Sequence, residues 1–241
     1  MEKKIIVFAP HPDDETLACG GTIIRKIKEG YKPFIVFLTD GAGGSTYTYY
    51  GTTSKLTCTE LKKIRREEAE NACKILCVNS SNLFFLNFQD RTLATNSKVA
   101  QEKVTEILRK LSPVEIYFPH KNDPNGDHLA TNSIVKGSLA ALSVSPIRYQ
   151  YVIWSLSELG RNWSFPSQVW RCMKHKVHAV RQSDGDIVSI DIQEFLSLKM
   201  KAINEYKSQT TLFFPEQKQP ILTESFVEKF LSGKEEFYVT T

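Results

Sequence analysis

The residues best suited to chemistry lie in one short stretch, Ala-Pro-His-Pro-Asp-Asp-Glu at residues 9–15. This stretch contains an imidazole and three consecutive carboxylates within five residues, His11, Asp13, Asp14 and Glu15. Charges so close repel one another unless they share a cation, and a divalent metal is the simplest such cation. The alternative is the start of a helix, where acidic side chains complement the positive end of the helix dipole. We favour the metal.

The surrounding elements determine which other side chains can join this stretch. Residues 5–8 form an apolar run that predicts a buried parallel strand, and residues 17–27 predict a helix after it. Further strands are expected at 33–39, 83–88 and 114–119, alternating with helices at 59–76, 97–111 and 129–142. This alternation is typical of a parallel sheet with crossover helices. We therefore predict an α/β, Rossmann-like three-layer sandwich with a mostly parallel central sheet.

The pattern changes in the last third of the chain. The expected elements there are strands at 148–154, 171–180 and 187–192 and a helix at 193–207. Apolar anchors follow at Phe213, Phe214, Phe226, Phe230 and Phe237. A chain of 241 residues is long enough for one substantial α/β domain. We expect these extra strands and this helix to wrap that domain, which then spans residues 1–241.

Composition narrows the class of protein. The net charge is only +4 and the basic residues are scattered, so nothing indicates a nucleic-acid partner. No stretch approaches the roughly 20 apolar residues that span a bilayer, so we expect no transmembrane segment. There is no secretory signal, and the five cysteines include no Cys-x-x-Cys pair, which favours reduced thiols in a cytoplasmic protein. Homo-oligomerisation remains open.

Polar side chains after four predicted strands form one candidate site. The carboxyl ends of strands in an open parallel sheet meet at one edge, so the segments after residues 9, 39, 88 and 119 are pooled. The pooled side chains are His11, Asp13, Asp14, Asp40, Asp90, His120, Asp123, Asp127 and His128. Two imidazoles and one carboxylate around an open position is an arrangement that catalytic zinc hydrolases use.

Five segments, at residues 9–15, 38–43, 65–69, 88–90 and 126–128, resemble motifs of the PIG-L/LmbE-like zinc deacetylases. They occur in the family's order over about the first 140 residues. Members of that family remove acetyl groups from N-acetylglucosaminyl conjugates and related amides. The resemblance therefore implies a zinc-dependent N-deacetylase that acts on a small N-acetylated sugar or sugar conjugate.

The resemblance also implies roles for individual residues. It makes His11, Asp14 and His128 the zinc ligands, with another divalent metal left open, and Asp13 the general base. A zinc held by three protein groups lowers the pKa of a bound water to about 7, and a carboxylate that does not bind the metal can then take the proton. In addition, the resemblance makes Arg65 and Asp90 sugar-binding groups.

One position departs from the family pattern. Many members have a histidine three residues before the second metal histidine, and this chain has Asn125 there. An asparagine can donate a hydrogen bond to a developing oxyanion, but it cannot transfer a proton. We expect Asn125 to supply such a donor, with His120 as a substitute. The alternative is that Asn125 only shapes the turn Asp-Pro-Asn-Gly at residues 123–126.

Two other functions remain open alongside N-deacetylation. One is a zinc amidase or esterase on another acyl group, and the other is a metal- or sugar-binding protein with little turnover. Asp13 favours an enzyme, because a pure binding site does not need a second carboxylate that leaves the metal free. We expect substrate specificity to lie in the loop at 41–57 and in the C-terminal third.

Overall fold

The computed structural model describes residues 2–43, 56–142, 145–155, 186–213 and 217–240. They form a seven-stranded sheet with the order β3-β2-β1-β4-β5-β7-β6. The strands are β1 (Lys3–Ala9), β2 (Tyr31–Thr39), β3 (Leu83–Phe88), β4 (Glu115–Pro119), β5 (Ile147–Tyr151), β6 (Asp186–Asp191) and β7 (Lys234–Thr240). β1 to β5 pair in parallel, and β7 is antiparallel to β5 and β6. The prediction of a mostly parallel sheet is confirmed.

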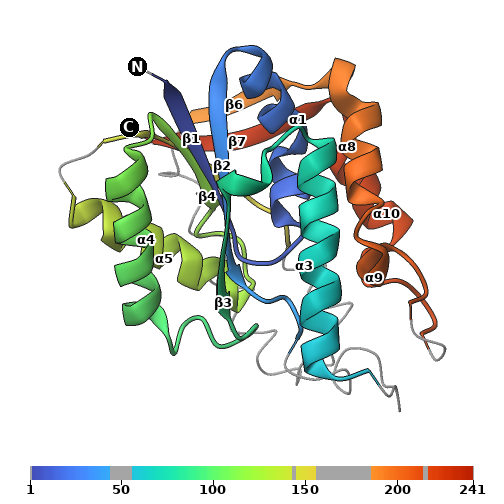
Figure 1. The fold of residues 1–241 in the computed structure, drawn as a ribbon. Helices are drawn as coiled ribbons and strands as arrows, with labels where there is room; N and C mark the ends of the chain where they lie inside the picture. Colours follow the sequence, from blue (N-terminus) through green and yellow to red (C-terminus); the bar gives the residue numbers. More distant parts are fainter. Residues whose placement is uncertain (1, 44–55, 143–144, 156–185, 214–216, 241) are drawn as a thin grey trace, which may run out of the picture.

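Helices cover both faces of the sheet (Figure 1). α4 and α5 pack on one face, and α1, α3 and α8 pack on the other. The helices are α1 (Asp14–Lys28), α3 (Cys58–Ile75), α4 (Ser97–Leu111), α5 (Gly126–Ala140), α8 (Leu196–Ile203), α9 (Lys207–Thr210) and α10 (Glu224–Val227). Short 3-10 turns are η1 (Ser80–Asn82), η2 (Gln193–Phe195) and η3 (Glu228–Phe230). This is the expected three-layer arrangement.

The central strand β1 is buried on both of its faces. Ile5 and Val7 point into the core beneath α1 and α3, whereas Ile6 and Phe8 point into the core beneath α4 and α5. All four side chains are fully buried. Because successive side chains of a strand point to opposite faces, a strand covered on both sides must be apolar throughout. This is why residues 5–8 form a continuous apolar run.

The strand order reverses at β1. The chain passes from β1 to β2 on one side, and β4 later pairs with the other side of β1. The loops that follow β1 and β4 therefore leave the sheet edge in divergent directions, which is the topological switch point where open α/β sheets bind ligands. This topology brings the segment after Ala9 next to the segment after Pro119.

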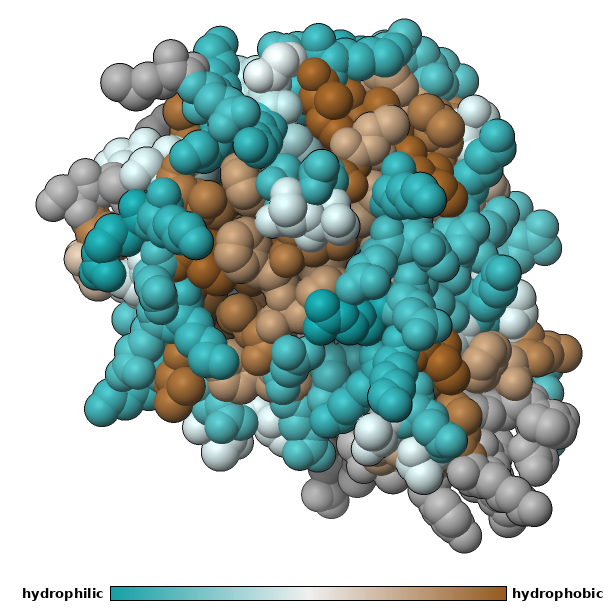
Figure 2. All heavy atoms as spheres, in the orientation of Figure 1, coloured by the Kyte–Doolittle hydropathy of each residue, from teal (hydrophilic) through white to brown (hydrophobic). Residues whose placement is uncertain are grey.

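Edge strand β3 carries an apolar stretch on the face shown in Figure 2, between α4 and α3. Five of its residues are half-buried: Leu83, Phe84, Phe85, Leu86 and Phe88. Two basic side chains cover part of this edge. The Arg66 guanidinium lies 4.2 Å from the centre of the Phe85 ring, and Lys103 Nζ lies 5.3 Å from that of Phe88. The cation–π contacts hold these charged groups over the apolar rings, and charged groups on an edge strand oppose its pairing with another chain.

The structure differs from the sequence-based expectation at α5 and β7, and it divides the single helix expected at 193–207 into η2, α8 and the start of α9. α5 begins at Gly126 rather than near 129, because the Asn125 side chain caps the helix. β7 was not anticipated as a strand. The expected strand at 171–180 and residues 44–55 of the expected loop lie outside the described residues. Among the described helices, none combines the length and apolar content that crossing a bilayer requires.

Candidate metal centre and active site

Three side-chain atoms form a nearly equilateral triangle at the β1–β4 switch point. His11 Nδ1 lies 3.3 Å from both Asp14 Oδ2 and His128 Nε2, and those two atoms are 3.2 Å apart. We call this set the ligand triangle. Tetrahedral zinc binds N and O ligands at about 2.0–2.1 Å, which puts neighbouring ligands about 3.3–3.4 Å apart. The ligand triangle therefore matches one face of such a tetrahedron, and its donor set fits zinc.

The ligand triangle is assembled from the two switch-point loops and the helices that follow them. Asp14 is the first residue of α1, and its Oδ2 also accepts the His11 backbone N–H at 2.9 Å. His128 lies in the first turn of α5 and is fully buried. Because each helix begins at or just before its residue of the ligand triangle, the positions of Asp14 and His128 are fixed by packed helices.

Mutual attraction keeps the metal-free triangle charged. Burial alone lowers the pKa of His128, but the carboxylates of Asp123 and Asp14 raise it to about 10. Burial likewise opposes ionisation of Asp14, but His128 and His11 hold its pKa well below the usual range. A metal ligand must be a neutral imidazole or a carboxylate, so a bound cation takes the place of the imidazole protons.

Asp123 holds the second nitrogen of His128. Asp123 Oδ2 lies 2.8 Å from His128 Nδ1, and both side chains are fully buried. The same oxygen accepts the backbone N–H groups of Ile153 at 2.9 Å and Trp154 at 3.1 Å. A carboxylate behind a ligating imidazole fixes the tautomer and turns the free nitrogen toward the metal. Sequence reasoning placed Asp123 in the pooled site but gave it no role.

Two further carboxylates hold the second nitrogen of His11. His11 Nε2 lies 3.3 Å from Asp90 Oδ1 and 3.2 Å from Asp127 Oδ2. These three residues also lie within metal-binding range of one another. However, the carboxylates already accept backbone N–H groups, namely those of Gly43, Arg91 and Leu93. We therefore assign Asp90 and Asp127 as acceptors that orient His11, so that its Nδ1 faces the ligand triangle.

Asp13 is the one acidic residue of the turn whose carboxylate is left uncommitted. Within the described residues its side chain makes no hydrogen bond or ion pair, although the residue is only 7% exposed. Its backbone has φ 136° and ψ −30°, a region that costs a non-glycine residue on the order of 1–3 kcal/mol. Burial and the Asp14 charge raise the pKa of Asp13 well above its usual range, although Arg65 and His11 act in the opposite direction.

Comparison with known proteins identifies the family. Residues 6–138, more than half of the chain, match the family model of PIG-L, described as GlcNAc-PI de-N-acetylase. The chain belongs to the PIG-L family. It is 26% identical over 221 residues to the diacetylchitobiose deacetylase of Thermococcus kodakarensis, covering 89% of this chain and 71% of the relative. It is 25% identical over 213 residues to a probable N-acetyl-alpha-D-glucosaminyl L-malate deacetylase 2 of Bacillus cereus, covering 87% and 85%.

Solved structures confirm the PIG-L fold. The N,N'-diacetylchitobiose deacetylase of Pyrococcus horikoshii superimposes with a TM-score of 0.68 at 24% identity, covering 99% of this chain and 84% of that one. GalB, a 4-carboxy-2-hydroxymuconate hydratase of Pseudomonas putida, superimposes with a TM-score of 0.65 at 19% identity, covering 95% and 82%. Because a hydratase has the same fold, the reaction of this PIG-L protein must be argued from its site.

Arg65 of the PIG-L helix motif lies beside the site. It is buried on α3, and a Cβ added at Gly41 would lie 3.7 Å from Arg65 Nη1 and only 2.7 Å from Pro12 Cδ. Gly41 has φ +62°, so the loop after β2 needs glycine both for its backbone and for this close approach. The loop after β2 therefore lies against both the Arg65 guanidinium and Pro12 of the turn that carries Asp13.

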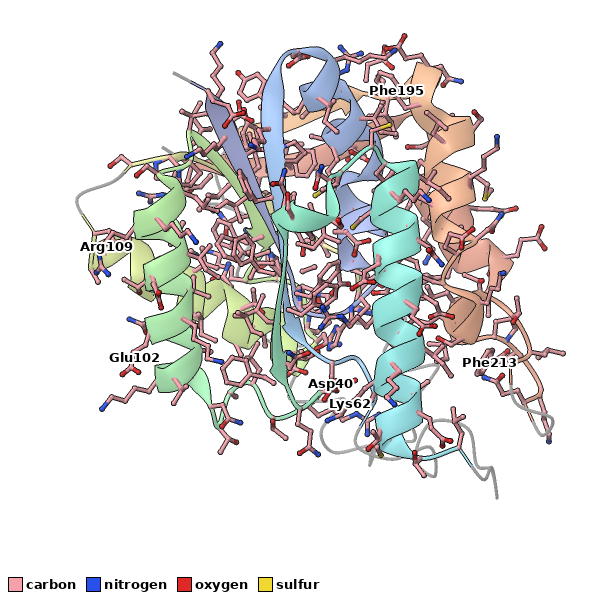
Figure 3. All side chains as sticks on the ribbon, in the orientation of Figure 1. Asp40, Lys62, Glu102, Arg109, Phe195 and Phe213 are labelled. Carbon is pink, nitrogen blue, oxygen red and sulfur yellow. The ribbon has the colours of Figure 1, made fainter. Side chains whose placement is uncertain are left out.

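Asp40 and His120, both in the pooled set, lie outside the ligand triangle. Asp40 Oδ2 lies 2.7 Å from Lys62 Nζ, and both residues are labelled at the carboxyl edge of the sheet in Figure 3. Asp40 Oδ1 accepts the Asp90 backbone N–H at 3.3 Å, so Asp40 supports the turn that carries Asp90. His120 Nδ1 accepts the Asn122 N–H at 3.2 Å, and its ring stacks on Tyr238 at 4.2 Å between ring centres.

Asn125, the departure from the PIG-L pattern, caps α5. Its Oδ1 accepts the backbone N–H of Asp127 at 2.9 Å, and its own N–H donates to Asp123 Oδ1 at 3.1 Å. This cap starts the helix that carries His128. Because only the oxygen of the Asn125 amide is used for capping, its Nδ2 still offers two N–H donors.

Proposed function

We propose that this protein is a divalent-metal-dependent hydrolase that removes the acetyl group from the amide nitrogen of an N-acetylglucosamine-type sugar or sugar conjugate. One observation carries the proposal, namely that a buried carboxylate, Asp13, lies uncommitted beside the metal-fitting ligand triangle. A site built only to hold a cation does not need that carboxylate. Membership of the PIG-L family supports the same conclusion.

His11, Asp14 and His128 are the residues that would hold the metal, and zinc is the metal that we propose. When bound, the metal supplies Lewis acidity, which polarises the amide carbonyl and makes a water molecule more acidic. Asp123, Asp90 and Asp127 keep the two imidazoles oriented with one nitrogen each toward the ligand triangle. Such outer carboxylates also make the ligating imidazoles more basic.

Asp13 is proposed as the general base. It takes a proton from the water that attacks the amide carbonyl, and it then gives that proton to the departing amine nitrogen. A base works best when its pKa lies near the working pH, and burial raises the pKa of Asp13 in that direction. The charge of Arg65 limits this rise, so the carboxylate stays able to accept a proton.

Three residues are proposed to act on the substrate. Arg65 and Asp90 are proposed to bind the sugar, with the oxygens of Asp90 shared between that role, His11 and the Gly43 N–H. Asn125 is proposed to donate from Nδ2 to the oxyanion that develops on the amide carbonyl, while its Oδ1 caps α5. The acyl group is proposed to be acetyl because the named relatives are deacetylases of N-acetylglucosamine conjugates.

The proposed function is tested by loading the protein with zinc and incubating it with N-acetylglucosamine, N,N'-diacetylchitobiose and N-acetylglucosaminyl malate. Released acetate and free amine are both measured, so that cleavage of the amide is distinguished from other hydrolysis. We expect equal amounts of the two products from at least one substrate. A protein that binds one zinc but releases neither product from any of them is a binding protein, and the proposal fails.

A further inference from the structure

One distant segment holds the peptide group between Pro12 and Asp13, directly at its carbonyl and through Glu15 at its N–H. The Pro12 carbonyl accepts a hydrogen bond from Gln209 Nε2 at 2.7 Å. At the other end of that peptide, the Asp13 N–H donates to Glu15 Oε2 at 3.2 Å, and Glu15 Oε1 accepts from the Tyr206 hydroxyl. We call residues 206–209 the clamp segment. It includes the start of α9 and lies outside the residues that match the family model.

We propose that Tyr206 and Gln209 are positioning residues that fix the direction of the Asp13 carboxylate. This inference rests on the proposed function, in which Asp13 is the general base. The peptide that the clamp segment holds is the one that sets φ of Asp13, and that φ has the unusual value of 136°. Rotation of this peptide would swing the Asp13 side chain relative to the ligand triangle.

In the part of the chain that the structure describes, the backbone is what holds the Asp13 carboxylate in place. Within the described residues it makes no hydrogen bond of its own, so its direction follows from the backbone alone. A base must point at the proton that it removes, and a displacement of about 1 Å in such a group can cost about 100-fold in rate. A turn that carries an unsupported base therefore needs its backbone fixed from outside.

The clamp segment places polar side chains in the protein core. Apolar side chains could fill the same space if the turn did not have to be held. Tyr206 is 1% exposed, Gln209 is 3% exposed and Glu15 is fully buried. Buried polar groups are tolerated only when they are hydrogen-bonded, and here Gln209 binds the Pro12 carbonyl, whereas Tyr206 binds the Glu15 carboxylate that accepts the Asp13 N–H. The polar chemistry is thus directed at the turn rather than spread through the core.

The clamp segment also binds the helix that carries Arg65. The backbone N–H and the hydroxyl of Ser208 both donate to the Glu68 carboxylate at 2.7 Å. Glu68 lies three residues after Arg65 on α3. One short segment therefore ties the Asp13 turn and the Arg65 helix together, which keeps the base and the guanidinium in a fixed relationship.

The test uses two variants with matched controls in the full-length, zinc-loaded protein. Gln209→Ala removes the amide that binds Pro12, and Asn82→Ala removes a buried amide that binds the Pro33 carbonyl at 3.1 Å, at the opposite edge of the sheet. Tyr206→Phe removes a hydroxyl that binds a buried glutamate. Its control is Tyr117→Phe, because the Tyr117 hydroxyl binds the buried Glu115 at 2.7 Å.

We expect Gln209→Ala and Tyr206→Phe to lower kcat by about 10–100-fold while KM and zinc content stay the same. The two controls should lose comparable thermal stability and keep the wild-type kcat. In an Asp13→Asn background, Gln209→Ala should cause no further loss, because a residue that acts through Asp13 has nothing left to position. Independent losses in that background, or equal losses in the controls, would overturn the proposal.

A second measurement does not depend on turnover. Hydrogen exchange of the Asp13 backbone amide, followed by NMR in each variant, reports directly on the held peptide. Exchange should be faster in Gln209→Ala and Tyr206→Phe than in the wild type and the two controls. If the wild-type protein binds zinc but releases no acetate, the proposed function fails and the exchange rates alone decide the positioning role. Unchanged exchange at Asp13 overturns that role.

Discussion

Asp123 Oδ2 and His128 Nδ1 are 2.8 Å apart in a fully buried pair, and the opposite nitrogen of the same ring belongs to the ligand triangle. The pair links the ligand triangle to the segment that follows β5, because Asp123 also accepts the N–H groups of Ile153 and Trp154. The orientation of His128 is therefore set by the packing of two strands' ends and does not depend on the metal.

Asp123→Asn is expected to weaken zinc binding about 10–100-fold, because the amide has no negative charge to hold the His128 tautomer. A competition titration against a chelator of known affinity measures this change. Asp191→Asn serves as the control, since Asp191 is exposed, lies in β6 away from the ligand triangle, and its Oδ1 accepts the N–H of Gln193. Wild-type zinc affinity in Asp123→Asn would show that His128 needs no partner.

Asp90→Asn separates two roles of Asp90. If Asp90 orients His11 through the 3.3 Å contact and also binds the sugar, zinc affinity should fall about 10–100-fold, and hydrolysis of a glycoside should fall further than hydrolysis of a simple activated acetyl ester. We expect this outcome, because the oxygens of Asp90 are shared between His11, the Gly43 N–H and the proposed sugar, and equal losses on the two substrates would leave Asp90 with the orienting role alone. A loss confined to the glycoside, at unchanged zinc affinity, would instead assign Asp90 to the sugar alone.

Asn125 is expected to contribute to both stability and turnover. Asn125→Ala removes the cap of α5, which should cost about 1 kcal/mol of unfolding free energy, and also removes the proposed oxyanion donor, worth about 2.7–4 kcal/mol in the transition state. Asn125→Ser keeps a capping oxygen but is too short to reach the substrate. Normal turnover in the serine variant, measured per zinc-loaded molecule, would reduce Asn125 to a cap.

The metal-free protein should lose stability as the pH rises. His128 has a pKa of about 10 in the fold against 6.5 in an unfolded chain, so its protonated form stabilises the metal-free fold fully below pH 6.5. This contribution should decline through the interval up to about pH 10 and then be gone. Urea unfolding in the presence of a chelator measures it. A decline equally steep in His128→Gln would assign the effect to other groups.

Most of the fold could be predicted because its signals are local. The helix at 97–111 was predicted with its observed bounds, since its amphipathic pattern ends at Ser112-Pro113. β7 was missed because a charged residue, Glu235, occupies one of its buried positions. Lys199 Nζ lies 2.6 Å from Glu235 Oε1, and this ion pair allows Glu235 to be buried. A partner 36 residues away cannot be recognised from the alternation of apolar and polar residues along one strand.

The sequence predicted those residues of the candidate site that follow a strand end or belong to a family motif. Strand ends and family resemblance indicated His11, Asp14 and His128, which the structure brings together. The resemblance gave the two adjacent aspartates different roles, but the sequence alone could not show where each of the three consecutive carboxylates points. Asp14 and Glu15 are successive residues of α1 and are rotated by about 100°, so Asp14 reaches the ligand triangle and Glu15 turns to Tyr206. Asp13 precedes the helix with φ 136°, and its carboxylate stays uncommitted.

Zinc content and turnover, measured together in Asp13→Asn and Asp14→Asn, test the central claim that two adjacent aspartates have different roles. We predict that Asp13→Asn keeps one zinc per chain and loses turnover by about 100-fold or more, as the removal of a general base requires. We predict that Asp14→Asn loses most of its zinc. Loss of zinc in Asp13→Asn together with full occupancy in Asp14→Asn would contradict the account and exchange the two roles.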